Sequence, residues 1–151
     1  MASHLSILVT GSRTVIDGSL LCAALDTAVA SRGGYSRVSL HVGDCPTGVD
    51  MKARLWWGAR CWTGDTVLTS PDSMVEMFTG GDRARLYLYH ADWAGEGRAA
   101  GPIRNSRMVK AWDEDDGHHH AIAQWDGSSR GTLDCLAKVV RSCRSVEVIP
   151  A

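Results

Sequence analysis

Strand, turn and helix follow one another in the stretch AIAQWDGSSRGTLDCLAKVV, residues 121–140. The apolar run 121–125 predicts a strand, and from Leu133 onward the apolar residues recur at the spacing of one helix face. Between them lies the turn Gly127-Ser128-Ser129-Arg130-Gly131-Thr132. Free backbone N–H groups at the start of a helix attract phosphate and other anions, so this turn is predicted to be an anion-binding loop.

The rest of the chain alternates in the same way. Strands are predicted at 5–10, 38–42, 66–68, 86–89, 121–125 and 146–149, and helices at 21–28, after 47, at 103–112 and from 133. Residues 90–102 are predicted to be mostly loop, and residues 70–83 a connection in which Met74, Met77 and Phe78 form a helical turn. This order implies right-handed crossovers and a mainly parallel sheet. We therefore expect residues 1–151 to form one α/β domain, three-layered and Rossmann-like, with about five to six strands and helices on both faces.

Composition argues against several classes of partner. The formal net charge of −1 provides no overall field to attract nucleic acid. No apolar run approaches the roughly 20 residues that span a bilayer, and the N-terminus lacks the features of a signal peptide. The five cysteines form no Cys-x-x-Cys pair, which favours reduced thiols. We expect a cytoplasmic protein that has neither a membrane nor a nucleic-acid partner.

Three turns with glycine follow predicted strands, at Gly11, Gly43 and Gly127. Ligands bind beyond the carboxyl ends of parallel strands, so these turns are expected at one edge of the sheet. The first turn, Gly11-Ser12-Arg13, either binds phosphate through its hydroxyl, N–H groups and guanidinium or is an ordinary turn with an exposed arginine. Two such turns in one small chain suggest a nucleotide-like ligand.

The segment after Gly43 predicts an ordered helix start. Thr47 and Asp50 have the spacing of a capping box. Asp50 either completes this cap or accepts a hydrogen bond from a ribose hydroxyl. Cys45, beside a helix N-terminus, is a candidate nucleophile, although no histidine partner is evident nearby.

Arginines gather between residues 98 and 107. Pro102 suits the first turn of a helix, and Arg104 and Arg107, three residues apart, share one face of it. With Arg98 just before the helix and the amide of Asn105 beside them, these side chains predict an anion site. The alternative is a solvated basic helix face.

Other polar and aromatic clusters have plainer interpretations. The acidic run 113–116 and the adjacent His118, His119 and His120 are predicted to form a solvated loop, because neighbouring residues do not readily converge on one metal ion. No metal site is predicted. Trp93 and Trp125 either stack on a base or pack locally. The helix with Trp56-Trp57 could supply an apolar patch for a homodimer.

Four segments together resemble the SLOG superfamily, which unites the DNA-processing protein DprA with the LOG phosphoribohydrolases. They are Val9 to Arg13, Gly43 to Asp50, Asp92 to Met108 and Trp125 to Thr132. The small YspA/YpsA-related proteins are the most similar branch. The segments occur in family order and leave residues 59–85 unmatched.

The resemblance implies a nucleotide or nucleotide-derived ligand, such as ADP-ribose or a nucleoside phosphate, lying across the strand ends without a required cofactor. The residues predicted to bind it are Gly11, Ser12, Arg13, Gly43, Asp50, Arg98, Arg104, Asn105, Arg107, Gly127, Ser128, Ser129, Gly131 and Thr132. In the phosphoribohydrolases an arginine and a glutamate cleave the N-glycosidic bond of a nucleoside 5′-monophosphate. Arg104 matches the arginine, whereas the glutamate position holds the shorter Asp134. Binding without hydrolysis is the first hypothesis, hydrolysis by Arg104 and Asp134 the second, and DprA-like binding of single-stranded DNA the third.

Overall fold

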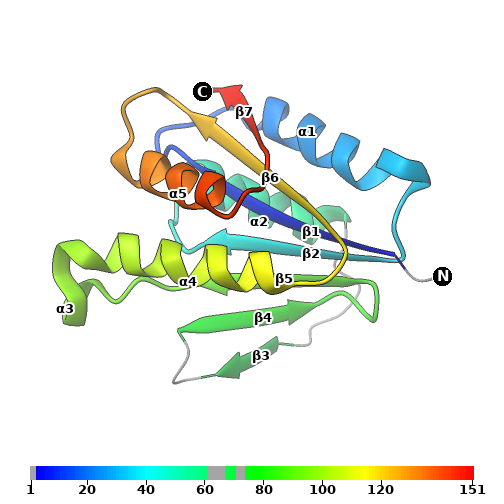
Figure 1. The fold of residues 1–151 in the computed structure, drawn as a ribbon, viewed down its shortest axis with the longest axis horizontal. Helices are drawn as coiled ribbons and strands as arrows, with labels where there is room; N and C mark the ends of the chain where they lie inside the picture. Colours follow the sequence, from blue (N-terminus) through cyan, green and yellow to red (C-terminus); the bar gives the residue numbers. More distant parts are fainter. Residues whose placement is uncertain (1–2, 61–66, 71–73) are drawn as a thin grey trace.

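The structure is a computed structural model that describes residues 3–60, 67–70 and 74–151. Its strands form one seven-stranded sheet in the order β3-β4-β5-β2-β1-β6-β7 (Figure 1). The strands are β1 His4–Gly11, β2 Arg37–Gly43, β3 Val67–Ser70, β4 Val75–Thr79, β5 Ala84–Tyr89, β6 His118–Trp125 and β7 Val146–Pro150. The helices are α1 Ser19–Ala30, α2 Gly48–Arg60, α3 Trp93–Glu96, α4 Ala100–Glu114 and α5 Arg130–Arg141, with short 3-10 helices at Ser31–Gly33 and Gly97–Ala99.

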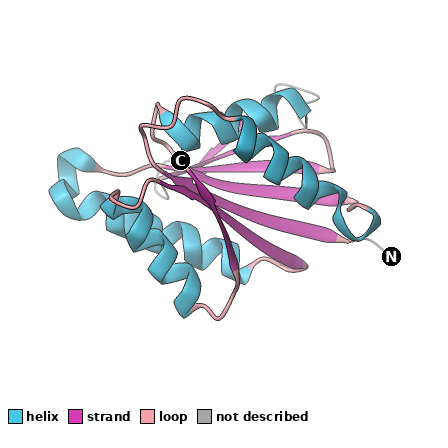
Figure 2. Cartoon of the chain, turned by 90° about the horizontal axis from the view of Figure 1, so that it is seen from above, coloured by secondary structure: helices cyan, strands magenta, loops and turns pink. Residues whose placement is uncertain are grey.

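Helices cover both faces of the sheet (Figure 2). On one face, Ile7 and Val9 of β1 pack with buried residues of α1 and α2. On the other, Leu8 packs with buried residues of α4 and α5. Because neighbouring side chains of a strand point to opposite faces, a central strand of this kind is apolar along nearly its whole length. The predicted three-layer α/β fold is confirmed.

Five strands are parallel, and an antiparallel hairpin extends one side of the sheet. β1, β2, β5, β6 and β7 run in one direction, whereas β4 is antiparallel to both β3 and β5. The sheet has seven strands rather than the expected five to six, because β4 was not predicted. The helical turn predicted at Met74, Met77 and Phe78 is wrong: Phe78 pairs with Leu86 of β5 and packs against the core beneath α1 and α2. Residue 66 of the predicted strand 66–68, and residues 71–73, lie outside the described residues.

Two predicted loops are also regular structure. Residues 90–102 contain α3, a 3-10 turn and the start of α4, which begins at Ala100 rather than Ile103. His118, His119 and His120 belong to β6, where they pair with the first residues of β1. Although these three residues are polar, backbone pairing with β1 continues along β6 as far as His118 and makes them part of the strand.

The topology brings three turns to one edge of the sheet. The chain passes from β1 to β2 on one side, and after α4 it returns to β6 on the other side of β1. The carboxyl ends of these three parallel strands therefore lie together, at the point where the strand order reverses. The turns after Gly11, Gly43 and Trp125 all leave from this edge.

Candidate functional site

A cleft that is partly open to solvent lies at this edge, with an accessible volume of about 90 Å³. The cleft is lined by Thr10, Gly11, Arg13, Gly43, Cys45, Asp50, Arg104, Asn105, Met108, Ser129, Gly131 and Thr132. Nine of the fourteen residues predicted to bind a ligand are in this set, contributed by four separate parts of the chain.

Gly43 is required where two charged side chains meet over the end of β2. A Cβ atom at this position would lie 2.5 Å from Nη1 of Arg104 and 2.7 Å from Oδ2 of Asp50. Both distances are shorter than van der Waals contact allows. The missing side chain therefore lets the guanidinium and the carboxyl group approach the same strand end.

Arg104 is held on one side and open on the other. Its Nη1 donates to Oδ1 of Asp44 at 3.0 Å, and its Nε donates to Oδ1 of Asn105 at 2.9 Å. The guanidinium has five N–H groups, so three remain after these two bonds. Arg13, the other arginine of the cleft, forms no ion pair with any residue that the structure describes. The cleft therefore has guanidinium donors available for an anion.

The N-terminus of α5 forms another wall. Ser129 caps the helix, and its Oγ accepts hydrogen bonds from the N–H and hydroxyl of Thr132 at 3.4 and 3.0 Å. Among the described residues, no acceptor pairs with the backbone N–H groups of Arg130 and Gly131. These groups lie at the positive end of the helix, which favours an anionic ligand.

Asp126 occupies part of the loop that the sequence assigned to phosphate. Its Oδ1 accepts hydrogen bonds from the N–H groups of Ser128 and Ser129 at 2.9 and 2.8 Å. These bonds, the one from Ser128 first, lower the pKa of Asp126. Gly127 and Ser128 do not line the cleft, and the predicted anion loop is thereby shortened to residues 129–132.

Asp50 is the buried acid of the cleft. Burial raises its pKa to about 6, although the nearby charge of Arg104 opposes this shift. Its Oδ2 accepts a hydrogen bond from the N–H of Cys45 at 3.3 Å. The helix begins at Gly48, directly after Thr47 as predicted, but among the described residues Asp50 makes this contact with Cys45 and no hydrogen bond with Thr47.

Other predicted residues lie outside the cleft. Ser12 is buried, and its Oγ accepts a hydrogen bond from the N–H of Asp126 at 3.2 Å, so it joins the turns after β1 and β6. Arg98 is exposed on the 3-10 turn before α4. Arg107 donates to the carbonyl oxygen of His90 at 3.5 Å. The structure does not bring these side chains to the wall of the cleft.

Asp134, the predicted catalytic carboxylate, is also outside the cleft. Its Oδ2 accepts hydrogen bonds from Asn105 at 3.1 Å and from Lys138 at 2.6 Å. Asn105 therefore stands between Asp134 and Arg104. The spacing of four residues along α5 explains the pairing with Lys138, since such residues lie side by side on a helix.

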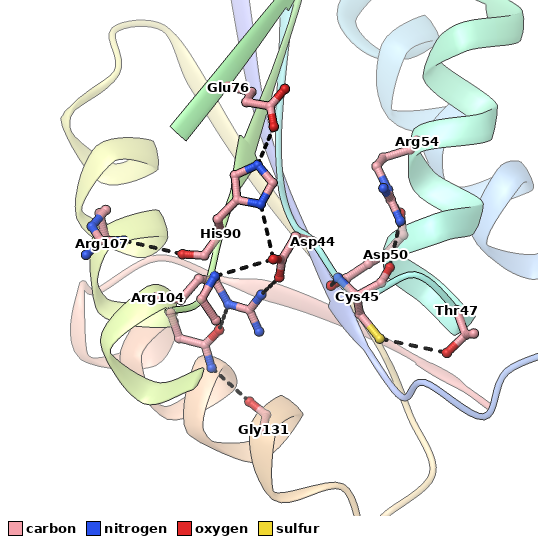
Figure 3. Close-up of polar contacts among 12 residues, drawn as sticks. Asp44, Cys45, Thr47, Asp50, Arg54, Glu76, His90, Arg104, Arg107 and Gly131 are labelled. Carbon is pink, nitrogen blue, oxygen red and sulfur yellow. Dashed lines mark hydrogen bonds and ion pairs between the residues drawn. The ribbon is translucent and has the colours of Figure 1, made fainter. Parts of the chain in front are cut away.

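Sequence analysis missed three residues that form a chain behind Arg104 (Figure 3). Asp44 contacts both Arg104 and Nδ1 of His90, and Nε2 of His90 contacts Glu76. Asp44 and His90 each directly follow a parallel strand, and that position was the signal available in the sequence. Glu76 comes from β4, whose pairing was not predicted.

The tryptophans contact neighbouring parts of the fold and do not line the cleft. Trp56 and Trp57 of α2 are buried, so these two side chains do not form the exposed apolar patch that was suggested for a homodimer. Trp125 donates from Nε1 to the carbonyl oxygen of Ser129 at 3.0 Å, and Trp93 is half exposed near Gly101. The cysteines at 22, 45, 135 and 143 carry free thiols, whereas residue 61 lies outside the described part of the chain.

Within the described ranges, no three His, Cys, Asp or Glu side chains are grouped so that they could hold a metal ion. No helix in these ranges has the length and apolar character needed to cross a membrane. Comparisons of the chain with models of protein families, with curated proteins and with solved structures find no match. A function is therefore argued from the fold and the cleft.

Proposed function

We propose that this chain binds a nucleotide or a nucleotide-derived metabolite, such as ADP-ribose or a nucleoside phosphate, in the cleft at the carboxyl edge of the sheet. The observation that carries the proposal is the convergence of Arg104, Arg13 and the start of α5 on one small space. Guanidinium groups and free backbone N–H groups are the usual partners of phosphate oxygens. The resemblance of four segments to the SLOG superfamily supports the same ligand class.

The acid in the cleft supports a ligand that also carries hydroxyl groups. Asp50 is buried next to Arg104 and lines the same space as Gly131. A carboxyl group there would accept a hydrogen bond from a ribose hydroxyl, while α5 and Arg13 would bind phosphate. Binding is favoured over hydrolysis because the carboxylate of Asp134 is engaged by Asn105 and Lys138.

A thermal-shift experiment tests the proposal with AMP, ADP and ADP-ribose. A ligand at 100 times its Kd stabilises the folded protein by about 2.7 kcal/mol, which raises Tm by several degrees in a chain of this length. Arg104→Ala and Gly131→Val should each abolish the shift. A Cβ atom at Gly131 meets no atom within 4 Å, so this variant should fold while filling the cleft.

Arg98→Ala is the matched control, since Arg98 is an exposed arginine outside the cleft. The rise in Tm that the ligand causes in this variant should equal the rise in the wild type. Circular dichroism checks that each variant is folded. Folded wild-type protein that shows no shift with any of these phosphorylated nucleosides would contradict the proposal.

A further inference from the structure

His90 lies between two carboxylates, each of which contacts one of its ring nitrogens (Figure 3). Nδ1 is 3.2 Å from Oδ2 of Asp44, and Nε2 is 2.5 Å from Oε1 of Glu76. The three side chains come from the ends of β2 and β5 and from β4. All three are mostly buried, with about a quarter to a third of each side chain exposed.

The number of protons in this arrangement follows from its chemistry. A neutral imidazole has an N–H at one ring nitrogen and a lone pair at the other, and ionised carboxylates only accept hydrogen bonds. Both contacts are therefore satisfied only when a proton lies in each of them. Full pairing of both contacts therefore requires one proton more than a neutral histidine with two carboxylates provides.

The other charged groups around His90 are arginines. Beyond Asp44 lies Arg104, whose Nη1 donates to the second oxygen of that carboxylate at 3.0 Å. Arg107 of α4 donates to the carbonyl oxygen of His90 at 3.5 Å. The backbone N–H of His90 donates to the carbonyl oxygen of Met74 at 2.8 Å, which fixes the residue against the start of β4.

We propose that His90 is a positioning residue, held as an imidazolium between Glu76 and Asp44, that makes anion binding by Arg104 depend on a proton. With the imidazolium present, the charges of Glu76, His90, Asp44 and Arg104 cancel. With a neutral imidazole, the same four groups carry one net negative charge beside the cleft. The step from His90 to the bound anion rests on the proposed function, whereas the protonation of His90 does not.

The loss of this proton would weaken anion binding in two ways. The added negative charge repels the ligand, and one carboxylate loses its hydrogen bond to the ring. If that carboxylate is Asp44, the partner that orients Arg104 becomes less fixed. One added charge beside a partly solvated anion site should raise the Kd by about five- to tenfold.

The first test needs no ligand. Long-range ¹H–¹⁵N NMR of protein labelled at histidine reports whether each ring nitrogen carries a proton, and His90→Gln assigns the signals. At pH 7 we expect both nitrogens of His90 to show the shifts of protonated nitrogens. In Glu76→Gln the ring should lose its second proton at lower pH than in the wild type. A wild-type spectrum with one unprotonated nitrogen at pH 7 would overturn the proposal.

The second test measures the Kd of ADP-ribose by calorimetry between pH 6 and pH 9. This ligand is chosen because a phosphate monoester itself titrates near pH 6, whereas the diphosphate of ADP-ribose keeps its charge over this range. In the wild type the Kd should rise about five- to tenfold as His90 loses its proton. In Glu76→Gln the rise should occur at lower pH.

His120→Gln is the control, because His120 contacts a single carboxylate, that of Glu147 at 3.0 Å, away from the cleft. It should follow the wild-type profile. Identical profiles for wild type and Glu76→Gln would overturn the coupling of His90 to the cleft. Failure of ADP-ribose to bind at any pH would overturn the proposed function and this coupling together, and the NMR result would still decide the protonation of His90.

Discussion

Nη1 of Arg104 donates to Oδ1 of Asp44 across 3.0 Å, although the two residues are 60 positions apart in the chain. This contact joins α4 to the end of β2 and sets one wall of the cleft. It depends on the absence of a side chain at Gly43. The first prediction concerns that glycine.

Gly43→Ala should remove ligand binding and lower stability. The new Cβ would displace Nη1 of Arg104 and Oδ2 of Asp50 from the end of β2; because both atoms end flexible side chains, the stability cost should be at the low end of the overpacking range, about 1 kcal/mol. Urea unfolding and the thermal-shift panel measure the two effects. Gly58→Ala in α2 is the control: no atom lies within 4 Å of its Cβ, and stability should rise by about 0.5 to 1 kcal/mol. A Gly43→Ala variant that binds the ligand as tightly as the wild type would contradict the role given to this glycine.

Asp50→Asn should stabilise the unliganded protein at neutral pH. The pKa of Asp50 is raised to about 6 by burial, so the folded state keeps its proton up to a pH at which the unfolded state has lost it. Stability from this group is present below about pH 4 and is lost as pH rises through 6. The variant should therefore gain about 2 to 3 kcal/mol at pH 7.5, and the gain should vanish near pH 4. Unfolding curves across this range check it; a gain that does not change with pH would point to another cause.

Replacement of two neighbouring acids at the end of α4, Asp115 and Glu114, should have very different effects on the stability of the protein. Asp115 accepts hydrogen bonds from His41 and from Ser6, both at 2.7 Å and both from buried side chains. Although partial burial acts against it, these bonds lower the pKa of Asp115. Asp115→Ala removes the partner of Nε2 of His41 and of Oγ of Ser6 and should cost about 2 to 4 kcal/mol. Glu114→Ala removes only an exposed pair with Lys110 and should change stability by less than about 0.5 kcal/mol.

His119→Phe should flatten the decline of stability in acid. Both ring nitrogens of His119 are shielded from solvent, and burial lowers the pKa of the ring. Because the unfolded state takes up this proton more readily, stability falls as pH drops below about 6.5. Phenylalanine keeps the edge contact with Trp112 and removes this dependence. His118→Phe, on the same strand but exposed, should retain the wild-type profile in pH-dependent thermal unfolding.

Incubation of the protein with AMP should release no adenine, as measured by liquid chromatography. Asp134, which the resemblance to the phosphoribohydrolases places at the position of their catalytic glutamate, is bound by Asn105 and Lys138 outside the cleft. Adenine release that disappears in Asp134→Asn would show that this interpretation of Asp134 is wrong. Release that disappears only in Asp50→Asn would instead assign hydrolysis to the buried acid.

Periodicity predicted most of the fold because it reports burial directly. The apolar strands and the amphipathic helices α1 and α5 were recognisable, and their alternation predicted the layers. β4 was not, since Met74, Met77 and Phe78 have the spacing of a helical turn, and only pairing with β5 makes this segment a strand. Short segments take their structure from tertiary neighbours that no local pattern reports.

The cleft was predictable where residues follow a strand or begin a helix. Arg13, Arg104 and Gly131 were found in this way, and all three line it. The contacts of individual side chains were not predictable. Asp126 accepts hydrogen bonds from the N–H groups of its own turn, and His90 contacts Glu76 of β4, a strand that was not predicted. The position of a residue along a parallel strand predicts the edge of the sheet at which it lies. It does not predict the contacts that its side chain makes at that edge.

The antiparallel direction of β4 brings Glu76, near its start, to the edge of the sheet where the parallel strands end and the cleft lies. Since β4 runs against its neighbour, Val75 pairs with Tyr89, and the start of β4 lies beside the carboxyl end of β5. A slip of this pairing by one residue would turn Glu76 to the other side of the sheet and leave His90 with a single acidic neighbour. Natural variation in the length of the turn at 80–83 should therefore be constrained, even though that turn lies at the far end of the hairpin from the cleft.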